Sequence, residues 1–566
     1  MILKMKQIKL MLLMAIIFAI SFTSCKKDDP PSPIPESPEM TSIAIYGENK
    51  NFDITLGFSE GVYKKTDATG DLDENSFNIS ISGGSDISSL IVTHSAGQKY
   101  TAIKIELVDY SNGEEKITIT PKDGNSIYNA TAVAMEVLQT QTIGLDGIAH
   151  ATINIKDDGN GTGTNTWTAN NIYLLDGMVF VNDGDILTIE AGTVIKGKPG
   201  QGENASALIV ARGGKIMAKG TAAEPIIFTA EADDLNGSVQ DLADGLWGGL
   251  IILGKATLNT VPGEQQIEGI PQTEPRGVYG GTDNSDNSGE IHYVSIRHGG
   301  SDIGEGNEIN GLTLGGVGNG TIIEFVEVFA NKDDGVEFFG GMPRLNNIIV
   351  AFCGDDSYDY DQGFRGYGQF WVAVQGYERG DRLGEHDGGT DPETGDPYAI
   401  PTVYNATYVG RGDGASKRTI TFRDNAGGNY ANSIFYNQEK PIDIELLVDE
   451  SSYTRFNNGQ LTIKNNMFYQ IDEPYLKVSI GDGVTDEEKN AADAALFGYF
   501  STASNNVADP GFNLNGNTFN IIPSNDVSGN MASTPDTWFK TVGYKGAIDP
   551  ANDWTAGWSL YSKYMN

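Results

Sequence analysis

The sequence predicts an all-β protein, in which a long solenoid of stacked coils follows a small β-sandwich. Two stretches, 326–338 and 348–360, are near-copies at an offset of 22 residues, since 348 − 326 is 22. In both, apolar and polar residues alternate, which is typical of strands with one buried face. A strand unit that recurs at a short constant period indicates a solenoid. Glycine supplies 71 of the 566 residues and is spread along the chain, as many tight turns require.

The first residues predict export and a lipid anchor. Three lysines precede the apolar run 10–22, which at 13 residues is too short to span a bilayer. Small residues then lead into Cys25. This arrangement resembles a bacterial lipoprotein signal over residues 1–24, although Phe22 replaces the usual leucine. The resemblance implies that Cys25 carries lipid and holds the protein on a membrane. An ordinary cleaved secretory signal is the alternative.

The residues after the cysteine predict display on the cell surface. Lys27, Asp28 and Asp29 resemble the export signal of Bacteroidetes-type surface lipoproteins, which implies an outer-membrane location facing the exterior. Residues 25–41 are expected to form the lipidated start and a Pro-rich tether. If Cys25 carries lipid, Cys353 is the one remaining cysteine, so no disulfide is expected within the chain.

The charge of the chain excludes several classes of partner. Without the three lysines of the signal, 35 basic residues (38 − 3) face 76 acidic ones, a formal charge of −41. Such a surface repels nucleic acid and acidic lipid head groups, so neither is expected as a partner. It also repels polyuronates such as pectin or alginate, unless cations bridge them.

Residues 42–145 predict a small Ig-like β-sandwich. Short alternating strands are expected at 54–58, 77–81, 103–107 and 116–120, with Gly, Asn and Asp between them. The phrases "ITLGFSEGV" and "ITITPKDGNSIYNATA" resemble bacterial Ig-like spacer domains. Because no catalytic constellation occurs here, a spacer role is expected.

Residues 150–566 predict the solenoid. Stretch 187–195 is echoed by 208–216 at an offset of 21, further short apolar strands follow, and no long helical period is apparent. Together the following phrases resemble right-handed parallel β-helix surface lipoproteins of pectin-lyase-like shape: "LTIEAGTVIKG", "GLWGGLIILGKA", "YVSIRHGG", "DDGVEFFGG", "TFRDNAGGNYANSIF" and "GYKGAIDPANDWTAGWSLY". That group is mostly of unassigned function, so the resemblance implies fold and location and brings no reaction.

Two long polar loops, 263–287 and 375–401, are expected to interrupt the coils. Loops on a rigid scaffold commonly carry binding residues, and an aromatic-rich stretch precedes the second loop. Aromatic faces suit sugar rings, although some of these aromatics are expected in the core. The candidate ligand-binding residues are Arg365, Tyr367, Gln369, Trp371, Arg379, Asp381, Arg382, Glu385, His386 and Asp387.

The doubled aspartates of the two near-copies are the main functional lead. Stacked coils lie ~4.8 Å apart, so each aspartate pair is expected almost directly over the other. Two unit charges at that distance repel by about 0.9 kcal/mol in water and by about 3.5 kcal/mol at an effective dielectric of 20. The stacked acids, which are the candidate metal ligands, are Asp333, Asp334, Glu337, Asp355, Asp356 and Asp359.

Three ways of accommodating these acids stay open. Calcium suits an exported protein, because it accepts several carboxylate and carbonyl oxygens in flexible geometry. Arg344 and Arg365 are the candidates for bidentate pairs with the acids. The third alternative is that Asp333 and Asp355 accept hydrogen bonds from turn amides.

The sequence leaves three functions open. Binding of a glycan or of an outer-membrane protein through one face of the β-helix is the favoured one. The second is a polysaccharide hydrolase or lyase, because "NKDDGV" resembles the doubled-aspartate motif of β-helical polygalacturonases. That family's downstream Gly-His-Gly and Arg-Ile-Lys segments are missing, so catalytic residues stay unassigned and catalysis is less favoured. The third is a structural or adhesive stalk.

Overall fold

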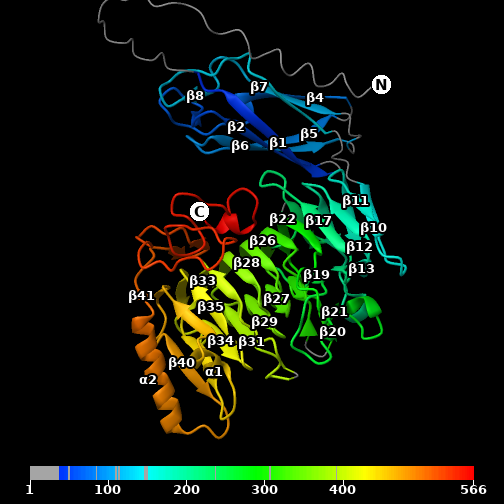
Figure 1. Cartoon of the computed structure of the whole chain (residues 1–566). Helices are drawn as coiled ribbons and strands as arrows, with labels where there is room; N and C mark the ends of the chain where they lie inside the picture. The colour runs from blue at the N-terminus through cyan, green and yellow to red at the C-terminus, as the bar shows by residue number, and fades with distance from the viewer. Residues whose placement is uncertain are drawn as a thin grey trace, which may run out of the picture. The chain divides into compact units, whose positions relative to one another are not determined.

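The computed structural model describes residues 37–565, except 49–50, 84–85, 109–110, 112–114, 146–150, 236, 305–306 and 391 (Figure 1). The expected lipidation and export residues Cys25, Lys27, Asp28 and Asp29 lie outside the described residues. The chain divides into two compact units at residues 148 and 149, and each is described by itself. In the described part of the chain, no helix is both long enough and apolar enough to cross a membrane.

The N-terminal unit contains two antiparallel sheets that share one apolar core. Ile54 and Ile103 of one sheet and Ile117 and Ile119 of the other are fully buried in that core. This arrangement fits the predicted Ig-like β-sandwich. The first sheet has the order β1 (Met40–Glu48), β2 (Asn51–Phe58), β6 (Tyr100–Leu107), β5 (Ile87–Thr93); the second has β4 (Phe77–Ser82), β7 (Lys116–Pro121), β9 (Gln141–Gly144); β3 (Val62–Tyr63) pairs with β8 (Tyr128–Asn129), and η1 spans Glu74–Ser76.

The second unit is built from two parallel sheets, and this confirms the predicted right-handed parallel β-helix. The smaller sheet has ten strands among the described residues, each adding one coil to the stack (Figure 1). Its strands, in order, are β13 (Met178–Val181), β16 (Ala207–Val210), β19 (Leu250–Leu253), β25 (Leu312–Gly315), β27 (Val336–Phe339), β29 (Tyr358–Asp361), β31 (Gly384–Asp387), β34 (Ile420–Arg423), β37 (Ile442–Leu446) and β40 (Leu476–Ile480).

The larger parallel sheet wraps the other sides of the coils. Its strands are β10 (Ala151–Ile155), β11 (Asn165–Trp167), β12 (Asn171–Leu175), β14 (Ile186–Ile189), β15 (Val194–Gly197), β17 (Lys215–Lys219), β18 (Ile226–Ala230), β22 (Gly289–Arg297), β26 (Ile322–Phe329), β28 (Arg344–Ala351), β30 (Tyr367–Val374), β32 (Thr402–Tyr404), β33 (Thr407–Gly412), β35 (Gly428–Ala431), β36 (Ile434–Gln438), β38 (Leu461–Lys464), β39 (Met467–Tyr469) and β41 (Asn506–Val507). Within β22, Tyr293 has a left-handed φ of 49°, and the residues in register with it on later coils share this conformation. These left-handed residues turn the chain, so one long strand covers two sides of a coil.

The core lies between the sheets and consists of inward side chains stacked from coil to coil. Tyr358 and Trp371 stack with ring centroids 4.6 Å apart, and Tyr360 and His386 stack at 4.1 Å. Because Trp371 and His386 are 2% and 1% exposed, they belong to the interior of the β-helix.

The expected loop 375–401 contains β31, so it was wrong to read this stretch as outside the coils. Alternating Glu385 and Asp387 made the strand look like a polar loop, because both outward positions are acidic. The other expected loop, 263–287, carries a hairpin of β20 (Glu264–Gln266) and β21 (Val278–Gly280). The remaining short elements are η2 (Gly202–Asn204), η3 (Pro275–Gly277), β23 (Asp302–Gly304), β24 (Asn307–Glu308), β42 (Asn513–Asn515), β43 (Thr518–Asn520) and η4 (Tyr561–Tyr564).

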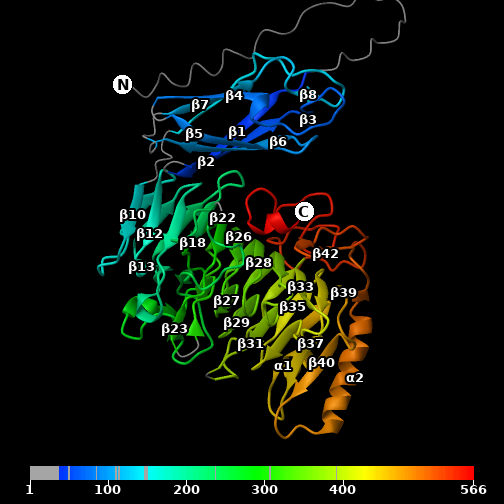
Figure 2. The ribbon, with the colours of Figure 1, turned by 180° about the vertical axis from the view of Figure 1, so that it is seen from behind.

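Two helices stand beside the last coils: α1 (Ser452–Asn457) and α2 (Asp486–Thr502) (Figure 2). The expectation of no long helix was wrong. Thr485 and Glu488 form a capping box at the start of α2. Asp493 of this helix accepts the amide of Val478 at 2.8 Å, which satisfies a donor of the last strand of the smaller sheet. The helix thus protects a sheet edge.

The C-terminal segment returns along the larger sheet. Glu327 is fully buried and accepts the amides of Leu560 at 2.9 Å and Tyr561 at 2.7 Å. Gln369, also fully buried, accepts the amide of Lys540 at 2.8 Å. These bonds hold the segment against the larger sheet. The outer surface of the smaller sheet is therefore the main candidate for a functional site.

Candidate functional site

The outer surface of the smaller sheet changes character along the β-helix. Residues at one outward position stack in direct register from strand to strand. The first three are apolar, and acids occupy the middle of the series. In order, the series is Phe180, Ile209, Ile251, Thr313, Glu337, Asp359, Glu385, Thr421, Asp443 and Lys477.

Acids also occupy the turns that enter the middle strands, and together with the outward acids they form the acidic face. Its members, on β27, β29, β31 and the turns before them, are Asp333, Asp334, Glu337, Asp355, Asp356, Asp359, Asp361, Asp381, Glu385 and Asp387. As expected, Glu337 lies in register with Asp359.

The second aspartate of each pair connects two coils. The Oδ1 atom of Asp334 accepts the amide of Asp356 at 2.8 Å. In the same way, Oδ1 of Asp356 accepts the amide of Arg382 on the next coil. These aspartates therefore cap amides of the following coil, whereas the turn-capping hypothesis concerned Asp333 and Asp355.

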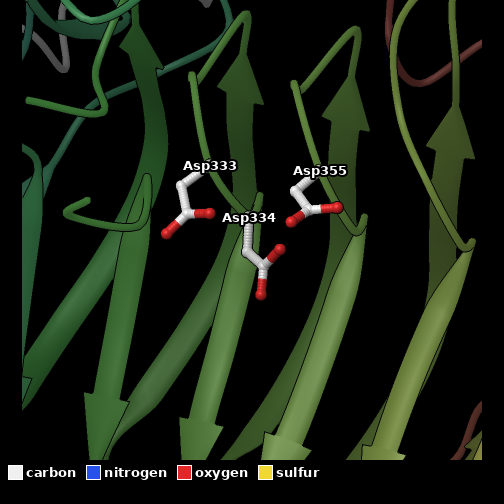
Figure 3. A group of neighbouring side chains, drawn as sticks. All are labelled: Asp333, Asp334 and Asp355. Atoms are coloured by element: carbon white, nitrogen blue, oxygen red, sulfur yellow. The ribbon is translucent and has the colours of Figure 1, made fainter. Parts of the chain in front are cut away.

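Three groups of acids on this face bring carboxylate oxygens within 4.8 Å of one another. The first contains Asp333, Asp334 and Asp355; Figure 3 shows Asp334 between the other two. The second contains Asp334, Glu337 and Asp359. These five acids have no ion pair with any described residue. The third group joins Asp355 and Asp356 to Asp381.

Two acids of the third group pair with Arg382, a residue that was expected to bind ligand rather than to pair with the aspartates. Arg382 lies 3.2 Å from Asp356, 3.3 Å from Asp381 and 3.0 Å from Glu385. Arg423 pairs with Glu385 at 2.8 Å and with Asp387 at 2.6 Å. The acidic face therefore has a paired half, whose acids contact guanidinium groups, and an unpaired half. The unpaired half consists of the five acids without ion pairs: Asp333, Asp334, Glu337, Asp355 and Asp359.

The expected pairing of the aspartates with Arg344 and Arg365 is wrong. The guanidinium of Arg344 lies 5.0 Å from the ring centroid of Tyr367. Arg365 donates to the carbonyls of Gly363 and Thr257, at 3.1 and 3.3 Å. Both lie on other parts of their coils.

Burial and neighbouring carboxylates make the unpaired half hard to ionise. Burial, followed by nearby acids, raises the pKa values of Asp334, Glu337 and Asp359 well above the usual range. For the same two reasons, the pKa of Asp333 rises to about 7, with Glu308 and Asp355 as the nearest contributors. At neutral pH these acids need either protons or a cation.

Two residues missed by the sequence reasoning complete the unpaired half. Glu268, from the loop that carries the β20–β21 hairpin, stands exposed at its rim. The side-chain amide of Asn310 donates to Glu268 at 3.2 Å and also to Glu337. Asn310 is 1% exposed, and its Oδ1 has no partner among the described residues; the same holds for Oδ1 of Asp359. Asn310 stacks beside Asp334, but 24 residues separate the two, and this differs from the 22-residue offset that the sequence displays.

A family model described as "Pectate-lyase like beta helix domain" matches residues 159–559. The chain belongs to this pectate-lyase-like β-helix family. Membership agrees with the coil architecture and supports a role connected with polysaccharides. No curated protein matches the chain.

One solved structure, the catalytic domain of a GH87 alpha-1,3-glucanase in complex with tetrasaccharides, is similar over 83% of this chain and 91% of that chain. The sequence identity is 10% and the TM-score is 0.18, so this likeness carries no argument about function.

The expected ligand-binding residues of this pectate-lyase-like β-helix fall into three places. Asp381, Arg382, Glu385 and Asp387 lie on the acidic face. Gln369, Trp371 and His386 are at most 2% exposed, so their side chains serve packing rather than surface contact. Burial lowers the pKa of His386 to about 3, so the ring is neutral. Its Nε2 lies 2.6 Å from the hydroxyl of Tyr430.

The other three expected residues lie away from the acidic face. Arg379 pairs with Asp244 and donates to the carbonyl of Leu242 at 2.5 Å. Tyr367 is half-buried beside Phe539, with ring centroids 5.1 Å apart. Arg365 donates to the backbone as described above. The sequence candidates therefore do not form one site; four of the ten meet on the acidic face.

Proposed function

We propose that this protein binds a polysaccharide along the acidic face of its β-helix, with calcium held among the unpaired acids. In this proposal a lipid on Cys25 anchors the chain in the outer membrane, and the β-helix faces the exterior. The family membership supports the polysaccharide part of the proposal. The anchor rests on the sequence signal alone.

The observation that carries the proposal is the ladder of Glu337, Asp359 and Glu385 on three neighbouring strands. A row of outward polar groups at the spacing of stacked strands suits an extended ligand that lies along the solenoid. The row is partly accessible to a ligand: Glu337 is buried, Asp359 and Glu385 are half-buried, and Asp355 and Glu268 at its margins are exposed.

Calcium is the ion that best suits the unpaired half of this face. It takes six to eight oxygen ligands at 2.3–2.6 Å from carboxylates, amide carbonyls and water. Asp334, Glu337 and Asp359 supply carboxylates within 4.8 Å of one another, and Asn310 adds an amide oxygen that has no partner in the described part of the chain. Bound calcium would remove the repulsion between these acids and present a positive centre to sugar oxygens.

The experiment that tests binding is a glycan panel with purified protein, in which retention, reducing ends and unsaturated products are all followed. We expect retention without turnover, in calcium but not in chelator. The variant Asp334→Asn with Asp359→Asn should lose retention, because both carboxylates leave the unpaired half. The matched control, Asp413→Asn with Asp482→Asn, removes two exposed acids elsewhere and should behave like the parent.

A hydrolase or lyase is the second candidate, and one observation favours it. Burial and the nearby carboxylate of Asp334 raise the pKa of Asp356, and a hydrogen bond with the carboxyl of Glu385 raises it further. A proton held between two acids is the arrangement by which a carboxylic acid stays protonated for acid catalysis. Turnover of any glycan in the panel, abolished by Asp356→Asn, would replace the binding proposal with this one.

Silence of the whole panel would instead leave an outer-membrane protein partner or a passive stalk. Crosslinking on whole cells, followed by identification of the captured protein, distinguishes these two readings. The anchor is tested separately: Cys25→Ala should release the protein from membranes, and replacing Asp28 and Asp29 with Ala should shield it from protease added to cells.

A further inference from the structure

A polar cavity lies outside the acidic face. Its volume is about 520 Å³, within the range typical of small-molecule sites. The cavity is bordered by turns that follow β13, β16 and β19 and by the β20–β21 hairpin with its flanking residues. Its lining residues are Asp183, Ala211, Arg212, Lys255, Glu264, Pro275, Arg276, Val278, Gly280, Gly281, Thr282 and Asp283.

Three charged residues on successive coils form one wall of this cavity. Asp183, Arg212 and Lys255 each stand two residues after the end of their strand, so they follow one another along the β-helix. The Nζ atom of Lys255 lies 3.7 Å from Oδ1 of Asp183, which is longer than a hydrogen bond. The lysine therefore keeps donor capacity for a ligand.

The two arginines of the lining, Arg276 and Arg212, are held in place. The guanidinium of Arg276 lies 3.8 Å from the ring centroid of Phe180 and is held by Glu274 at 2.7 Å and Asp157 at 2.8 Å. Arg212 donates to the carbonyl of Gly280 at 2.8 Å and pairs with Glu264. Guanidinium groups held by such contacts keep their positions when a ligand enters.

Glycines let a ligand approach the backbone of the hairpin. At Gly280 and Gly281 the φ angles are 93° and 151°, and a Cβ atom would lie 2.6 Å from the carbonyl of Gly263 and 2.8 Å from that of Lys255. Side chains are therefore excluded at both positions, and the backbone itself forms part of the lining.

From this geometry we infer that the cavity binds one uncharged, hydroxyl-rich sugar unit. Three bases (Arg212, Lys255 and Arg276) are balanced by three acids (Asp183, Glu264 and Asp283), so a charged ligand of either sign gains little net attraction. A hydroxyl both donates and accepts, so a sugar can satisfy the carboxylates and the Lys255 amine together. Since no lining residue belongs to the acidic face, this site goes beyond the proposed function and needs no calcium.

The test is ligand-observed NMR of the full chain in chelator, with D-glucose, D-galactose and D-mannose as probes and D-glucuronate as the charged comparison. We expect saturable binding of at least one hexose and weaker binding of the uronate. Lys255→Met and Arg212→Gln should each weaken the hexose by about tenfold, the scale of a lost hydrogen bond to a charged group. Lys464→Met, an exposed lysine elsewhere, is the control and should leave binding unchanged.

Several results would overturn the inference. These are no saturable hexose binding by the parent, binding that survives both cavity variants, or a preference for the uronate. Circular dichroism and the thermal midpoint of each variant distinguish a lost contact from a lost fold. Asp334→Asn with Asp359→Asn should keep hexose binding, so failure at the acidic face and failure at this cavity are separable.

Discussion

The two ends of the outer surface of the smaller sheet carry opposite chemistry on the same backbone. At the first end, Phe180, Ile209 and Ile251 are at most 2% exposed. They form one apolar cluster with Ile267 and Tyr279, which belong to the loop and hairpin between β19 and β22. Burial of each such side chain stabilises the fold by roughly 1.5–3 kcal/mol.

Two to four coils after Ile251, the same stacked position carries Glu337, Asp359 and Glu385. Here the apolar cover ends: Phe339 beside Glu337 still packs against Tyr279, whereas Asp359 and Glu385 are half-buried and Asp355 at the margin is exposed. The backbone does not decide which end is covered, because the coils pair in the same way throughout. The outward side chains decide: apolar ones pack beneath a covering element, and acidic ones gather carboxylates that need protons or a cation.

The largest effect on stability is expected when an acidic residue replaces an apolar one at the covered end. Ile251→Asp buries a charge that has no partner beneath the hairpin region, and we expect a loss of about 3–5 kcal/mol. Chemical denaturation measures the loss. Thr313→Asp, one coil further along, is the comparison. A small loss of stability in Ile251→Asp would mean that the cover is loose and that the two ends do not differ as described.

Calcium should act at the acidic end alone. At a concentration one hundred times the dissociation constant, a bound ion stabilises the folded state by about 2.7 kcal/mol, which differential scanning calorimetry detects as a higher thermal midpoint. Asp334→Asn with Asp359→Asn should abolish this response while keeping the Oδ1 of residue 334 as an acceptor for Asp356. A parent protein whose midpoint ignores both chelator and millimolar calcium would refute the metal proposal.

Alternation along single strands allowed much of this surface to be predicted. The outward direction and register of Glu337 and Asp359 follow from a local pattern of period two. Asn310 and the pairing of Arg382 with the aspartates were missed because the coils differ in length: from Asn310 to Asp334, Asp356 and Arg382 the steps are 24, 22 and 26 residues. A constant repeat length therefore does not align such residues in the sequence.

Other misses have a different physical origin. The helix α2 was overlooked because only Ala492 and Leu496 of its 17 residues are buried, so its apolar stripe is too narrow to show a helical period. Trp371 was taken for a surface residue, yet it follows Phe370, whose left-handed φ of 58° turns the chain and resets which side chains face inward. Neither feature has a clear signature in one sequence.

The pH should affect stability at the acidic end in a defined direction. The pKa of Asp333 is raised to about 7 in the folded state, so this group binds more protons there than in the unfolded chain between about pH 4 and 7. Its contribution is therefore full at low pH and is lost as the pH rises toward 7. In chelator, the thermal midpoint should fall over this range, less steeply in Asp333→Asn. Calcium should oppose the fall at the upper end, and a midpoint that rises through this window in chelator would contradict the assignment.

The smallest effect is expected at the boundary between the two ends, where the loop that covers the apolar side contributes Glu268 to the acidic side. Glu268 is exposed, and its carboxylate accepts a hydrogen bond from Asn310 at 3.2 Å. Glu268→Gln keeps an acceptor for Asn310, so we expect stability in chelator to change by less than about 0.5 kcal/mol. Calcium affinity, measured by isothermal titration calorimetry, should fall several-fold because one negative charge leaves the rim. Glu203→Gln, an exposed acid outside the face, should change neither quantity. Unchanged affinity in Glu268→Gln would place the ion away from Glu268, among Asp333, Asp334 and Asp355, and would separate the covering loop from the chemistry of the site.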